Sequence, residues 1–112
     1  MKLAIIGSRN ITNVDIEQYL PQGVTEIISG GAKGVDTLAK EYAVSHNIKY
    51  TAFLPDYAHF KKGAPLKRNE KIALYSDAAL IFWNGISKGT KHAIDCFKKL
   101  NKDVILISIK NS

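Results

Sequence analysis

Cysteine is almost absent from this sequence, in which Cys96 is the only one among 112 residues. A single cysteine cannot form an internal disulfide, and no second cysteine is available to begin a zinc-binding motif. Cys96 lies in an apolar pattern with helical spacing, so we expect it to pack in the core rather than act as a nucleophile. His46 and His59 are isolated from other potential ligands, and we predict no metal site.

Long hydrophobic runs are also missing, although hydrophobic residues make up 46% of the chain. No run approaches the roughly 18 to 20 apolar residues that cross a bilayer, and the Met1-Lys2-Leu3 start lacks the apolar segment of a signal peptide. We therefore expect a cytoplasmic protein that does not enter the membrane. The length is typical of one domain, so residues 1–112 are predicted to form a single unit with a buried core.

Short apolar runs alternate with helical patterns along the chain. The apolar runs are Leu3–Ile6, Ile27–Ile28, Tyr50–Leu54, Ala78–Trp83 and Val104–Ile109. The helical patterns between them cover Asp15–Leu20, Val35–Ala43, Pro65–Ser76 and Thr90–Leu100. Continuous apolar runs favour strands that are buried on both faces. The alternation predicts an α/β fold in which a five-stranded parallel sheet lies between two layers of helices.

Three loops rich in small residues follow predicted strands, at the edge where parallel sheets of this kind bind ligands. They contain Gly7-Ser8-Arg9, Ser29-Gly30-Gly31-Ala32-Lys33-Gly34 and Ser87-Lys88-Gly89-Thr90. Glycines allow a ligand to come close to the backbone, and the N–H groups at the start of the next helix favour phosphate or carboxylate. The loops therefore predict an anion site, in which two helix N-termini hold one anion each or grip a single anion together.

Three charged residues lie beside these loops. Arg9 and Arg68 are the only arginines among sixteen basic residues, and the fork of an arginine suits phosphate recognition. An ordinary surface position is the alternative for each of them. Asp36 is unexpected beside an anion site, because its charge repels an anion. It either caps or electrostatically stabilises the helix, or bonds a ribose hydroxyl, or acts as a catalytic acid or base.

Neutral side chains are available to complete such a site. Asn69 and Thr90 can supply hydrogen bonds, while Ser8 and Ser87 can do the same or cap turns. His92, near the start of the last predicted helix, either donates to a phosphate or packs as a half-buried side chain.

A basic group precedes the fourth predicted strand and contributes much of the formal charge of +6. It consists of Lys61, Lys62, Lys67, Arg68 and Lys71. Tyr57, His59 and Phe60 flank it, which suits a phosphate-bearing partner such as a nucleic acid. The alternative is a solvated, lysine-rich surface.

Several motifs occur in an order that resembles a known superfamily. They are Gly7-Ser8-Arg9, Ser29–Asp36, Gly63-Ala64-Pro65 with Arg68-Asn69, Ser76-Asp77-Ala78 and Ser87–Ile94. The superfamily is SLOG, which contains the DNA-processing protein DprA (Smf) and the LOG-type phosphoribohydrolases, and the chain most resembles its small YspA-like branch. The resemblance implies a Rossmann-like sheet of order 3-2-1-4-5 whose crevice takes a nucleotide or nucleotide-derived ligand. It also implies phosphate contacts at Gly30, Gly31, Gly34, Gly89 and Thr90, with Arg68 in the family's arginine position.

One position departs from the LOG-type enzymes, which carry a glutamate four residues after the glycine of the late Gly-Thr motif. Ala93 stands there in this chain and can neither stabilise a cationic sugar nor activate water. We therefore expect a protein that binds a nucleotide-derived ligand, needs no separate cofactor and forms a homodimer or higher homo-oligomer. Two alternatives stay open. One is hydrolysis of a nucleotide N-glycosidic bond with Asp36 as the catalytic carboxylate, and the other is single-stranded DNA binding as in DprA.

Overall fold

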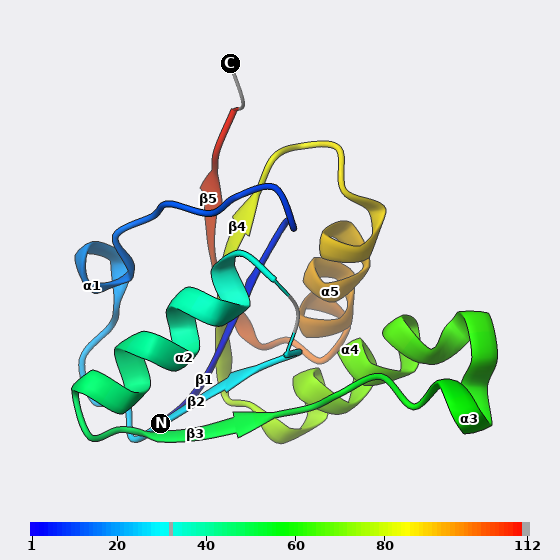
Figure 1. Ribbon diagram of the computed structural model, residues 1–112, viewed down its shortest axis with the longest axis horizontal. Helices are drawn as coiled ribbons and strands as arrows, with labels where there is room; N and C mark the ends of the chain where they lie inside the picture. Colours follow the sequence, from blue (N-terminus) through cyan, green and yellow to red (C-terminus); the bar gives the residue numbers. More distant parts are fainter. Residues whose placement is uncertain (32, 111–112) are drawn as a thin grey trace.

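The sheet has five parallel strands in the predicted Rossmann-like order. In the computed structural model, which describes residues 1–31 and 33–110, the strands are β1 (Lys2–Gly7), β2 (Glu26–Ser29), β3 (Lys49–Ala52), β4 (Ala78–Trp83) and β5 (Asp103–Ser108). Neighbouring strands pair in parallel in the order β3-β2-β1-β4-β5, which confirms the expected 3-2-1-4-5 arrangement (Figure 1). The carboxyl end of β1 therefore lies between those of β2 and β4.

Helices cover both faces of the sheet. They are α1 (Ile16–Tyr19), α2 (Val35–Ser45), α3 (Tyr57–Phe60), α4 (Ala64–Tyr75) and α5 (Lys88–Lys99), with a short 3-10 turn, η1, at Lys61–Gly63. The first two pack on one face of the sheet, and α4 and α5 pack on the other, as right-handed crossovers require (Figure 1). No helix in the described part of the chain is long and apolar enough to span a membrane.

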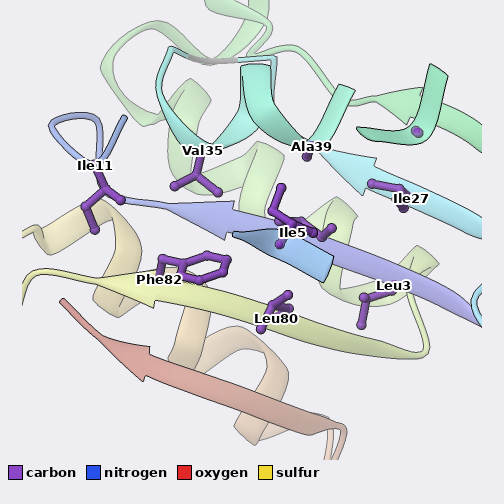
Figure 2. Packing of buried hydrophobic residues seen from close by; sticks show 10 residues of the cluster. Leu3, Ile5, Ile11, Ile27, Val35, Ala39, Leu80 and Phe82 are labelled. Carbon is purple, nitrogen blue, oxygen red and sulfur yellow. The ribbon is translucent and has the colours of Figure 1, made fainter. Parts of the chain in front are cut away.

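Side chains of β1 alternate between two hydrophobic clusters, because successive residues of a strand point to opposite faces. Leu3 and Ile5 pack with Val35 and Ala39 of α2 (Figure 2). On the other face, Ala4 packs with side chains of α4 and α5, namely Ile72, Ala73, Ile94 and Phe97. Burial on both faces was predicted for every strand, but β3 and β5 contain no fully buried residue. The helices pack mainly over the central strands, which leaves these edge strands partly open.

The segment between β3 and α4 departs from the sequence prediction. The apolar run predicts a strand up to Leu54, but β3 ends at Ala52 and the Leu54 side chain is 69% exposed. The reason is that β2 ends at Ser29, opposite Ala52, so the following residues have no strand to pair with. Asp56 instead caps the unpredicted helix α3, because its carboxylate accepts a hydrogen bond from the His59 N–H at 3.2 Å.

A buried carboxylate, Glu26, lies at the amino end of β2, far along the sheet from the strand ends that carry the glycine loops. Its Oε2 atom accepts hydrogen bonds from the Tyr75 hydroxyl at 2.6 Å and the Thr51 hydroxyl at 2.7 Å. Burial raises the pKa of this carboxyl, but these hydrogen bonds and the charges of Lys49 and Lys2 outweigh burial and hold the pKa below its ordinary value. The ionised form is therefore part of the folded structure.

Glu26→Gln is expected to flatten the pH dependence of stability on the acid side. A carboxyl with a lowered folded-state pKa contributes stability above its unfolded pKa, about 4.3, and loses it as the pH falls through the folded value. The variant should be less stable than the wild type near neutral pH and should lose less stability in acid. Urea unfolding across about pH 3 to 7 measures this. Glu70→Gln, at an exposed carboxylate 3.8 Å from Lys67, is the matched control. Parallel stability curves for Glu26→Gln and the wild type would contradict the expectation.

Candidate functional site

A cleft opens at the carboxyl ends of β1 and β2, against the first turns of α4 and α5. Its volume is about 120 Å³. It is lined by Ile6, Gly7, Arg9, Gly30, Asp36, Pro65, Arg68, Asn69, Ile72, Ser87, Gly89 and Thr90. The neighbouring strands β1 and β4 belong to the two oppositely wound halves of the sheet, so the cleft lies at the point where the winding reverses.

Arg68 reaches into this cleft from α4 and is held at two of its nitrogens. Its Nη1 donates to the Gly30 carbonyl at 2.8 Å, and its Nε donates to Asn69 Oδ1 at 3.1 Å. Burial lowers the pKa of the guanidinium and the charge of Arg9 lowers it further, whereas the carboxylate of Asp36 acts in the opposite direction. Arginine keeps its proton in any such setting. Within residues 1–31 and 33–110, neither Arg9 nor Arg68 has a carboxylate oxygen within 4.0 Å, so two positive side chains and the more distant carboxylate of Asp36 share the cleft.

Asn69 connects Arg68 to the last helix, and its contacts determine the orientation of its amide. Its Oδ1 faces a donor, Arg68 Nε, and its Nδ2 faces an acceptor, the Gly89 carbonyl, at 3.2 Å. The same Nδ2 lies 3.3 Å from Nδ1 of His92. Because an amide nitrogen only donates, His92 Nδ1 is the acceptor and the ring hydrogen is on Nε2. His92 thus accepts a hydrogen bond from Asn69 and does not line the cleft.

Asp36 and Arg68 hold the glycine loop from opposite sides. The Asp36 Oδ2 atom accepts a hydrogen bond from the Gly30 N–H at 3.1 Å, while Arg68 binds the carbonyl of the same residue. Asp36 is only 6% exposed, and it lines the cleft. This contact with the loop backbone is separate from the three roles considered for the carboxylate. The amide of Gly30 consequently points to a side chain of the protein.

Gly34 directly precedes α2 and has a backbone conformation that other residues avoid. Its φ is +79° and its ψ is −122°. A Cβ atom placed on it would lie 2.7 Å from the Ile11 carbonyl oxygen and 2.9 Å from that of Arg9. The absence of a side chain therefore lets the glycine loop pack directly on the loop that follows β1. Gly34 does not line the cleft, so its role is to bring these two loops together.

Ser87 and Thr90 form the start of α5, which begins at Lys88, two residues before the predicted start at Thr90. The Ser87 hydroxyl accepts hydrogen bonds from the Thr90 N–H at 3.3 Å and from the Thr90 hydroxyl at 3.1 Å. This is the N-cap arrangement that the sequence left open for Ser87. The Thr90 hydroxyl also lies 3.3 Å from that of Ser8, which is 1% exposed. Ser8 therefore joins the loops after β1 and β4 rather than lining the cleft.

The cleft brings together most of the side chains and glycines that the sequence indicated. Those that line it are Gly7, Arg9, Gly30, Asp36, Arg68, Asn69, Ser87, Gly89 and Thr90. Those that do not are Ser8, Ser29, Gly31, Gly34 and His92. Sequence reasoning missed the apolar lining, which is Ile6, Pro65 and Ile72. Ile6 ends a predicted strand, and Pro65 and Ile72 lie in a predicted helix, and neither pattern separates cleft residues from core residues.

Tyr50 is a second omission, because it was taken only as part of a strand. Its hydroxyl forms a hydrogen bond with the fully buried hydroxyl of Ser29, directly before the glycine loop. Burial raises the pKa of the Tyr50 phenol, and the charge of Asp36 acts in the same direction. The hydroxyl of Ser29 therefore has Tyr50 as its hydrogen-bond partner, and Ser29 does not line the cleft.

Cys96 packs against the hydrophobic core, as expected, but it is only partly buried because it also lines a groove between α4 and α5. The groove forms because Leu74 and Leu100 border it without closing over it. Burial raises the pKa of the Cys96 thiol, which disfavours the thiolate that a nucleophile requires. The described residues contain no group of three or more histidine, cysteine or acidic side chains that could hold a metal ion.

The family YAcAr, described as the YspA, cpYpsA-related SLOG family, matches residues 1–60. The chain belongs to this family. The matched residues of this SLOG protein include Arg9, Gly30 and Asp36, whereas Arg68 and the start of α5 lie beyond them and join the cleft through the tertiary structure. No curated protein and no solved structure gives a significant match.

Proposed function

We propose that this SLOG domain binds a nucleotide or a nucleotide-derived ligand through its phosphate groups in the cleft. The observation that carries the proposal is the pair of arginines, Arg9 and Arg68, that line one cleft without a carboxylate partner within 4.0 Å in the described residues. Like charges in one partly buried site repel each other, and a bound phosphate would relieve this repulsion.

The residues of the cleft include several hydrogen-bond donors from which a phosphate could accept. A guanidinium carries five N–H donors, of which the contacts to Gly30 and Asn69 use two, so the others can face a ligand. The Thr90 N–H donates to the Ser87 hydroxyl, whereas the N–H groups of Lys88 and Gly89 have no partner within the helix, and Gly89 and Thr90 form part of the cleft lining. The dipole of this helix adds partial positive charge.

The size of the cleft suits one end of such a ligand. Its 120 Å³ is below the roughly 300–1,000 Å³ typical of sites that enclose a drug-sized molecule. We therefore place the phosphate and part of the sugar inside the cleft and the remainder of the ligand at its mouth.

Isothermal titration calorimetry with AMP, GMP, ADP-ribose and ribose 5-phosphate tests the proposal. At least one of these compounds should bind, and affinity should decrease as salt concentration rises, because the contacts are ionic. Inorganic sulfate at the same ionic strength should compete with the ligand. A folded protein that binds none of the panel at low salt would contradict the proposal.

A hydrolase is the second candidate, and the position of Asp36 in the lining is the observation that favours it. The position of the LOG glutamate is Ala93, which is 1% exposed and does not line the cleft. Asp36 would therefore have to act alone while its Oδ2 accepts a hydrogen bond from the glycine loop. For these reasons we favour binding over hydrolysis.

Incubation of the wild type and of Asp36→Asn with AMP or GMP is expected to release no free base. The asparagine keeps an oxygen that can accept from the Gly30 N–H, so the loop should stay ordered while a negative charge beside the anion is removed. The variant should consequently bind the nucleotide as tightly as the wild type or more tightly. Chromatography of the reaction mixture and calorimetry measure the two effects. Base release by the wild type that disappears in Asp36→Asn would establish the hydrolase instead.

A further inference from the structure

Two large nonpolar side chains stand exposed beside the cleft, on the segment that follows β3. Leu54 is 69% exposed and Tyr57 is 55% exposed. Large nonpolar residues that gather next to a polar cleft, rather than scattering singly, commonly mark a binding surface. The question is whether these two belong to the cleft.

Leu54 lies directly against the glycine loop. A Cβ atom placed on Gly31 would collide with the Leu54 side chain, so the two residues are in contact across the edge of the sheet. Gly30, the residue before, lines the cleft and accepts a hydrogen bond from Arg68. Leu54 therefore contacts the residue that directly follows Gly30, and Gly30 lines the cleft.

Tyr57 begins α3, which packs against α4, the helix that carries Arg68. Tyr57 lies three residues after Leu54, and its charge is among those that act on the pKa of the Arg68 guanidinium in the upward direction. The backbone around Tyr57 is held in place by Asp56, whose two carboxylate oxygens bind the backbone N–H and the ring Nδ1 of His59 at 3.2 and 2.7 Å. The aromatic ring thus stands on an ordered turn between Leu54 and the helix that carries Arg68.

We infer that Leu54 and Tyr57 form the surface that receives the base of the ligand, with the ring of Tyr57 stacked on the base. This inference rests on the proposed function and names the chemical class that the site prefers, which is a phosphate ester that carries an aromatic base. Stacking on an aromatic side chain tolerates any base, because each base has a π face. Leu54 covers the edge of the stacked base next to the glycine loop. A sugar phosphate without a base gains nothing from either residue.

The test compares AMP, GMP and ribose 5-phosphate in calorimetric titrations of the wild type, Tyr57→Ala, Tyr57→Phe and Phe60→Ala. The wild type should bind the better of the two nucleotides more tightly than ribose 5-phosphate. Tyr57→Ala should lower the affinity for that nucleotide by roughly 5- to 100-fold and leave the affinity for ribose 5-phosphate unchanged. Tyr57→Phe keeps the ring and should restore the affinity. Phe60, on the same short helix but facing Lys71 at 5.6 Å from its ring, is the matched aromatic control and should have no effect.

The outcomes separate this inference from the proposal on which it rests. Suppose that ribose 5-phosphate binds and that the wild type and Tyr57→Ala bind the nucleotide with equal affinity. This result would support the phosphate site and overturn the inference about the base. An equal loss of nucleotide and ribose 5-phosphate in Tyr57→Ala would also overturn it, because the tyrosine would then support the fold rather than the base. A wild type that binds neither nucleotide nor ribose 5-phosphate would overturn both proposals.

Discussion

Gly34→Ala is expected to destabilise the protein by about 3 kcal/mol or more, which is a large part of the roughly 5–15 kcal/mol that keeps a domain folded. Two costs combine at this position. The φ of +79° is unfavourable for any residue with a side chain, and the added Cβ would lie 2.7 and 2.9 Å from two backbone carbonyl oxygens. Backbone atoms cannot rotate away as the end of a side chain can. Urea unfolding followed by circular dichroism gives the free energy of unfolding.

Two further glycines separate these costs. Gly23 has a φ of +82° with no atom within 4 Å of an added Cβ, so Gly23→Ala reports the conformational cost alone, about 1–2 kcal/mol. Gly89 also has open space and stands in the first turn of α5, where alanine is preferred over glycine by up to about 1 kcal/mol. Gly89→Ala should therefore be neutral or stabilising. If Gly34→Ala cost no more than Gly23→Ala, the contact between the loops after β1 and β2 would not be as rigid as the structure indicates.

Arg68→Met is expected to weaken nucleotide binding by about 10- to 100-fold. A hydrogen bond to a charged group contributes roughly 1.5–3 kcal/mol, and each 1.4 kcal/mol corresponds to a factor of ten. Arg68→Lys keeps the charge but loses the planar fork, so its affinity should lie between those of the wild type and the methionine variant. The change is measured by calorimetry with the tightest ligand of the panel.

The side chain of Arg68 also binds the Gly30 carbonyl, so a loss of fold must be separated from a loss of contact. Thermal unfolding of each variant shows whether the domain remains folded at the temperature of the titration. Lys71→Met removes the same charge from the same helix at a position that does not line the cleft, and it should change affinity little. Equal weakening by Arg68→Met and Lys71→Met would mean that the ligand responds to net charge and not to a specific contact.

Much of the fold was predictable from local patterns. The strand and helix order follows from the spacing of apolar residues, which records directly which face of each element is buried. The pattern failed at Leu54, because whether an apolar run continues as a strand depends on a neighbouring strand, and β2 ends at Ser29. It also missed α3, none of whose residues is buried, so that burial imposes no apolar spacing on this helix.

The candidate site was predictable in its residue types but not in its contacts. Two scarce arginines and three glycine-bearing loops at strand ends were visible as a set, because parallel strands place their carboxyl ends along one edge. Asp36 was the uncertain residue, and sequence offered three roles for it without a means of choosing. The hydrogen bond from the Gly30 N–H depends on how α2 packs on β1, which no spacing in the sequence records.

The sequence by itself thus determined a parallel α/β sheet, because the spacing of apolar residues is a local property. It also indicated hydrogen-bond donors suited to phosphate at one edge of the sheet, because residue chemistry is local as well. Only the tertiary structure decided which of these residues face the cleft and which support it. Ser8 and Gly34 turned out to join loops and Ser29 to bond to Tyr50 of β3, while Arg68 and Asn69 link the glycine loop to α5. Hydrogen bonds form only within about 3 Å. Distances of that size between segments far apart in the chain are set by how helices and strands pack, and not by the order of residues.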